Sequence, residues 1–133
     1  MNEQNLKEVY MEYQMIEQQT KQFHRQLEAV AQQLMEMNST IISLEEFGKL
    51  KPQKEIFVPI NSGIFAKARL ENAEELLVNV GAGIVVAKDI PSTKKIISAQ
   101  VEELKQVQKR MIEELESLAS KAAQIEKIIE AAQ

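Results

Sequence analysis

The chain has 133 residues, no Cys, and a net charge of -4 from sixteen basic and twenty acidic side chains. This length suits one domain or one subunit of an assembly, and the acidic balance argues against nucleic acid, which needs basic surface to displace phosphate counterions. The absence of Cys excludes disulfides, thiolate zinc sites and cysteine nucleophiles, and the single His24 excludes any site with two imidazoles.

The chain shows neither a secretory signal nor a membrane span. Its longest apolar stretch, residues 81–87, is far shorter than the roughly 20 residues that cross a bilayer. We therefore expect a soluble, cytoplasmic protein with no membrane partner.

Gly and Pro divide the chain into three segments. All four Gly and all three Pro lie between positions 48 and 91, and these residues are the strongest local breakers of regular structure. We expect a long helix in residues 1–47, an irregular or β segment in 48–91 and a second long helix in 92–133, all within one subunit.

The first segment carries a stripe with alternating spacings of three and four, which is typical of a coiled coil. Gly48 follows it and suits a left-handed C-terminal cap. Eleven of the twelve stripe positions are apolar: Leu6, Val9, Tyr13, Ile16, Thr20, Phe23, Leu27, Val30, Leu34, Met37, Ile41 and Leu44.

The last segment repeats this pattern, starting near Pro91 and Ser92 or Thr93. Because a narrow stripe needs a partner, we expect the two helices to pack against each other as an antiparallel coiled coil, with both termini at one end. The second stripe is apolar except at Gln108: Ile97, Val101, Leu104, Gln108, Met111, Leu115, Leu118, Ala122, Ile125 and Ile129.

The middle segment predicts two β-hairpins, giving an α+β fold. Four short runs rich in β-branched residues, 54–60, 64–70, 76–80 and 84–88, are separated in pairs by Asn61-Ser62-Gly63 and Gly81-Ala82-Gly83. Strands this short cannot enclose a core, so we expect their edges to pair with strands of other subunits. The oligomerisation residues expected on one face are Ile56, Val58, Ile60, Ile64, Ala66, Leu76, Val78, Val80, Ile84 and Val86.

No arrangement of residues indicates catalysis, a metal site or a cofactor site. Gly81-Ala82-Gly83 precedes a strand and not a helix, so it is read as a turn and not as part of a dinucleotide site. His24 has no identifiable partner, and the glutamates are dispersed over exposed helix positions. We expect no enzyme.

Apolar residues are in surplus where the first helix begins and the last one ends. Tyr10 and Ile128 lie off the stripes, and Tyr10, Met11 and Met15 are either incidental or part of a partly exposed surface. The surplus is equally compatible with a partly exposed binding surface and with scattered surface apolar residues. The candidate binding residues are Leu6, Val9, Tyr10, Tyr13, Ile125, Ile128 and Ile129.

The order of helix, two hairpins and helix resembles the archaeal-type alpha class of prefoldin subunits over nearly the whole chain. The resemblance is most specific at Phe57-Val58-Pro59-Ile60, Gly63, Ala66-Lys67-Ala68-Arg69-Leu70 and Leu77-Val78-Asn79-Val80-Gly81-Ala82-Gly83. Two hairpins favour alpha over beta, which has one. The chain departs from the pattern in its single Gly in the first turn and in Ile84-Val85, where aromatic residues are common.

The resemblance implies an ATP-independent chaperone. Two alpha and four beta prefoldin subunits would join their hairpins into an intersubunit β-barrel platform, forming a hexamer. The coiled-coil tips would hold unfolded proteins and deliver them to a group II chaperonin. The alternative is an alpha-like structural subunit that self-assembles into a scaffold or filament.

Overall fold

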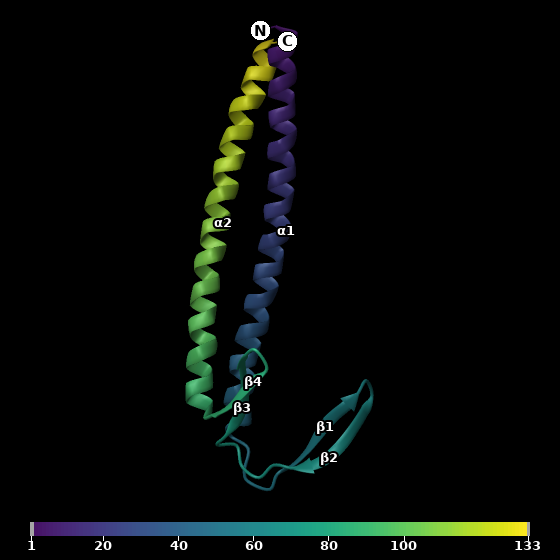
Figure 1. Ribbon diagram of the computed structural model, residues 1–133, viewed down its shortest axis with the longest axis vertical. Helices are drawn as coiled ribbons and strands as arrows, with labels where there is room; N and C mark the ends of the chain where they lie inside the picture. The colour runs from purple at the N-terminus through teal and green to yellow at the C-terminus, as the bar shows by residue number, and fades with distance from the viewer. Residues whose placement is uncertain (1, 133) are drawn as a thin grey trace. The chain divides into compact units, whose positions relative to one another are not determined.

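The computed structural model describes residues 2–132 and contains two long helices with two β-hairpins between them (Figure 1). This architecture confirms the fold expected from the sequence. Met1 and Gln133, the outer limits of the expected helical segments, lie outside the described residues. The elements in chain order are α1 (Glu3–Phe47), β1 (Glu55–Asn61), β2 (Ile64–Arg69), β3 (Leu76–Gly81), β4 (Ile84–Lys88) and α2 (Ile90–Ala132).

The chain forms two compact units. The first consists of α1 up to Met35 together with α2 from Glu102 onward. The second, Glu36–Val101, holds the end of α1, both hairpins and the start of α2.

The core of the first unit is a single layer of side chains between two helices. Ile16 of α1 packs with Leu118 and Ile125 of α2. An early residue of α1 thus meets late residues of α2, so the helices are antiparallel in this unit, where Figure 1 shows them side by side. The half-buried residues that complete the cluster are Val9, Tyr13, Phe23, Ala122 and Ile129.

Both predicted stripes form the packed faces of the helices. All twelve positions in α1 and all ten in α2 are buried or half-buried, whereas most positions between them are exposed. No large side chain in residues 2–132 is completely buried, because each helix is covered by the other on one side only. The chain therefore has a thin core.

The helix starts are set by side-chain caps. Asn2 Oδ1 accepts a hydrogen bond of 2.8 Å from Asn5 N at the start of α1. At α2, Asp89 Oδ1 accepts one of 2.7 Å from Ser92 N, and the helix begins at Ile90. The expected start near Pro91 and Ser92 or Thr93 is thus one to three residues too late, because Asp89 supplies the cap and Pro91 fits the first turn.

The end of α1 packs closely against the start of α2. Gly48 does not have a positive φ, so the predicted left-handed cap is wrong. A Cβ at Gly48 would come within 3.1 Å of Ile90 Cδ1, so the small residue allows close approach of α1 to the start of α2. In the same second unit, Lys94 Nζ lies 2.9 Å from Glu45 Oε1, and this contact lowers the pKa of Glu45.

Each hairpin forms its own two-stranded antiparallel sheet, and Figure 1 shows each as a separate pair of arrows. Gly63 has a φ of 78° in the first turn. In the second, Ala82 and Gly83 have φ values of 52° and 73°, the two positive angles of a type I′ turn. The predicted Gly-containing loops therefore close both hairpins.

Candidate functional site

The first candidate surface is the end of the first unit at which α1 begins and α2 ends, residues 2–17 and 121–132, called the tip below. Tyr10 and Ile128 are exposed there, with exposed fractions of 41% and 42%. Ile125 is only 6% exposed because it packs against Ile16 and Leu118. The expectation that Ile125 belongs to the exposed apolar surface is therefore wrong. The other four candidates are half-buried: Leu6, Val9, Tyr13 and Ile129.

A hydrogen bond joins the two helices at the tip. The Tyr13 hydroxyl donates to Glu126 Oε1 at 2.7 Å. Hydrogen bonding to the Glu126 carboxylate, followed by desolvation and the negative charges of Glu126 and Glu17, raises the pKa of Tyr13 to about 12. Tyr13 therefore links the helices in addition to its place in the packed layer.

Two methionines at the tip are more exposed than any of the seven candidates. Met11 and Met15 have exposed fractions of 63% and 59%. They lie four positions apart, hence one above the other on α1, on the side away from the stripe of Val9, Tyr13 and Ile16. The sequence signal for them is this i, i+4 spacing outside the stripe, and the seven candidates do not include them.

The second candidate surface is the pair of hairpins. Val58 lies opposite Ala66, and Val78 opposite Val86, so these four candidates share one face of their sheets, as the alternation predicted. Ile60 and Val80 lie at register shifts of their strands, where the predicted alternation is interrupted. Four of the ten candidates are half-buried: Ile56, Ala66, Leu76 and Val78. The six exposed ones are Val58, Ile60, Ile64, Val80, Ile84 and Val86.

The opposite face of each hairpin also carries exposed apolar side chains, which the sequence reasoning missed. Phe57 and Phe65 are 61% and 60% exposed, and Leu77 is 76% exposed. Phe57 lies opposite Lys67, and Phe65 lies opposite Pro59, so both aromatic rings belong to the face that the ten candidates do not use. These exposed apolar side chains make the second face a further candidate for an interaction surface.

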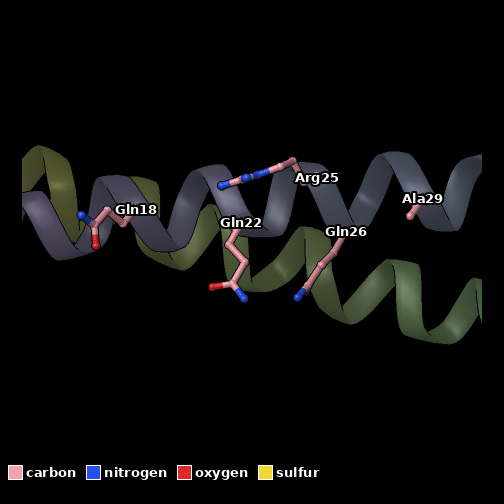
Figure 2. Close-up of a pocket in the computed structure, with 5 residues that line it drawn as sticks. All are labelled: Gln18, Gln22, Arg25, Gln26 and Ala29. Atoms are coloured by element: carbon pink, nitrogen blue, oxygen red, sulfur yellow. The ribbon is translucent and has the colours of Figure 1, made fainter.

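A hollow on α1 offers no reactive chemistry. Figure 2 shows its lining residues spread along one side of the helix, and all of them are exposed: Gln18, Gln22, Arg25, Gln26 and Ala29. Within residues 2–132, no group of three or more His, Cys, Asp or Glu is placed to hold a metal ion. None of the described helices is long and apolar enough to cross a membrane. The described surfaces suit binding of apolar partners.

Comparison with known proteins matches both the sequence and the fold. The family profile described as "Prefoldin subunit" matches residues 16–133. The chain is 27% identical to prefoldin subunit alpha of Thermofilum pendens, over 89% of this chain and 92% of that protein. It is 31% identical to prefoldin subunit alpha of Methanococcus maripaludis, over 80% of this chain and 71% of that protein.

The structure is similar to a solved one. A cryo-EM structure of filamentous PFD from Methanocaldococcus jannaschii superposes with a TM-score of 0.76 and 17% sequence identity. The match covers 88% of this chain and 94% of that chain. At this identity the likeness shows the fold.

Proposed function

Because this chain belongs to the prefoldin family, as a subunit of the alpha type whose relatives are non-enzymatic chaperone subunits, we propose that it holds non-native proteins without ATP. The family suggested by the sequence is confirmed, and with it the expectation that the chain is not an enzyme. The observation that carries the proposal is exposed apolar surface at the tip, provided by Tyr10 and Ile128. Non-native proteins expose apolar groups that such a surface can cover.

The tip binds the client through several weak contacts. A half-exposed side chain such as Tyr10 or Ile128 contributes less than the roughly 1.5–3 kcal/mol of a fully buried one. Tips on several subunits of one assembly act together, so the client is held by avidity and is still released to a group II chaperonin. Leu6, Val9, Tyr13 and Ile129 support these contacts from half-buried positions, and Ile125 from the core.

Suppression of client aggregation, measured by light scattering, tests this role. We expect Tyr10→Ser/Ile128→Ser to weaken suppression, and deletion of residues 1–10 with 125–133 to weaken it strongly at unchanged subunit number. Met35→Ser/Ile112→Ser is the matched control, since both residues are exposed apolar positions on the helices away from the tip. Full protection by the tip variants, or equal loss in the control, would show that clients bind elsewhere.

The hairpins assemble the complex. Their apolar faces and two-stranded sheets favour pairing with hairpins of other subunits, in a hexamer of two alpha and four beta subunits whose platform buries the ten candidate residues. Val78→Lys/Val86→Lys places charge on that face, and we expect sedimentation to show smaller species with helix content retained. Gln22→Lys/Gln26→Lys, which adds the same charge on exposed helix positions, is the control. A wild-type-sized assembly from the hairpin variant would refute the assignment.

Holding is passive and takes place in the cytoplasm. It is driven by burial of apolar surface, which requires neither nucleotide nor metal. Client protection should therefore persist in the presence of a chelator and in the absence of ATP. Loss of protection under either condition, with no chaperonin present, would contradict this mechanism.

A second candidate function is self-assembly into a scaffold or filament. The observation that favours it is apolar surface on both faces of the hairpins, such as Val58 on one and Phe57 on the other, which exceeds what one wall of a barrel buries. Native mass spectrometry of the chain alone and with a beta subunit separates the two functions. Large homomers that persist in the presence of beta would favour the scaffold.

A further inference from the structure

The exposed apolar side chains of the tip lie among an excess of carboxylates. Residues 2–17 and 121–132 contain six glutamates and three lysines, so most of the chain's net charge of -4 is concentrated there. Glu8 and Glu12 are exposed, and neither forms an ion pair with any residue from 2 to 132. The tip therefore has a negative field that its own lysines do not balance.

Two of these glutamates border the methionines on the outward side of α1. Glu8 precedes Met11 by three positions, and Glu12 precedes Met15 by three, so each glutamate is a neighbour of one methionine on the helix surface. Met11 and Met15 are themselves neighbours, four positions apart. We call these four residues the methionine ridge. Its thioether side chains are flexible and adapt to apolar partners of different shape.

We propose that the methionine ridge selects, among non-native segments, those that are apolar and flanked by Lys or Arg. This specificity rests on the proposed chaperone function and names the class of client that the tip prefers. The methionines cover apolar side chains of the client, and the carboxylates of Glu8 and Glu12 attract its flanking cations. The same carboxylates repel segments flanked by Asp or Glu, so the preference comes from both attraction and repulsion.

Two fluorescent peptides with one shared apolar centre test the proposal, one flanked by lysines and the other by glutamates. Their binding to the full-length protein is measured by fluorescence anisotropy at low salt and at high salt. We expect the lysine-flanked peptide to bind roughly three- to tenfold more tightly at low salt, as two exposed ion pairs allow. The preference for the lysine-flanked peptide should shrink at about 1 M salt, where the Debye length falls to roughly 3 Å and exposed charges are screened from each other.

Variants separate the two parts of the ridge. Glu8→Gln/Glu12→Gln should remove most of the preference and leave binding of the glutamate-flanked peptide equal or tighter. Met11→Gln/Met15→Gln should weaken binding of both peptides. The control Glu113→Gln/Glu116→Gln, which removes the same charge from exposed positions of α2 outside the tip, should retain the preference.

Each other outcome overturns the inference. Equal binding of both peptides, or a preference unchanged in Glu8→Gln/Glu12→Gln, would overturn the charge selection alone and leave the proposed holding function intact. Binding of neither peptide, together with no suppression of client aggregation, would overturn both. A smaller assembly for Met11→Gln/Met15→Gln in sedimentation would show that another copy of the chain covers the ridge, which also refutes client selection.

Discussion

Replacing Leu118 by Ala tests whether the single layer of side chains between α1 and α2 stabilises the fold. Leu118 is 6% exposed and packs with Ile16 and Ile125. A Leu→Ala change in a core costs about 2–5 kcal/mol, part of which is the cavity that remains. Because half-buried neighbours border this layer, the cavity is partly open to water and can partly close. We therefore expect a loss near the lower end, about 2–3 kcal/mol.

Thermal unfolding followed by circular dichroism at 222 nm measures this loss. For a chain of this length it corresponds to a fall in Tm of about 6–12 °C. The protein concentration must be the same for every variant, because assembly shifts apparent stability. Ile112→Ala is the control on the same helix: Ile112 is 45% exposed, and we expect a change within about 1 kcal/mol. Equal losses of stability for Leu118→Ala and Ile112→Ala would refute the role of the single layer of side chains between α1 and α2.

Three further changes test local features. Ala82→Gly should raise stability by about 0.5–1 kcal/mol, since the φ of 52° strains a residue with a Cβ, and an unchanged or lower Tm would contradict the left-handed turn. The raised pKa of Tyr13, about 12, means that its stabilising effect is complete below pH 10 and is lost as pH rises toward 12. As pH rises from 10 to 12, Tyr13→Phe should therefore lose less stability than the wild type, as measured by Tm. An equal fall in Tm for both proteins would argue against the bond to Glu126. The lowered pKa of Asp89, caused by its bonds to Ser92, places the loss of its cap at acid pH, below the ordinary aspartate pKa of about 3.9. Asp89→Ala should reduce helix content at neutral pH while Asp89→Asn keeps most of it, and equal ellipticity at 222 nm for all three proteins would refute the cap.

The binding surfaces differ in how they were reached from the sequence. The apolar hairpin face around Val58 and Val78 followed from alternation, because successive side chains of a strand point to opposite sides. The register shifts at Ile60 and Val80, which interrupt this alternation, were not predicted. The second face, with Phe57 and Phe65, was missed because alternation was used to find one buried side, and here both sides carry exposed apolar residues. At the tip, the exposure of Met11 and Met15 was left open, because a stripe pattern identifies the packed face of a helix and not which of its other side chains are exposed.

The sequence by itself determined the elements and their pairing. A stripe at spacings of three and four specifies a helix with one buried face, and the turn residues around Gly63 and Gly83 specify where the strands reverse. Two helices of matching length with one stripe each then have an obvious partner in each other. These are local signals, because helical periodicity and turn dihedrals depend on residues close together in the chain.

Only the tertiary structure decided which side chains near the chain ends are covered and which are free. Ile125 is buried because Ile16 lies across from it, and Tyr13 bonds to Glu126, 113 positions away. A side chain at Gly48 would crowd Ile90, since its Cβ would come within 3.1 Å of Ile90 Cδ1, a contact that the residues next to Gly48 in the sequence do not predict. Burial, hydrogen bonding and pKa depend on groups from distant parts of the sequence, which folding brings together and which no short pattern contains.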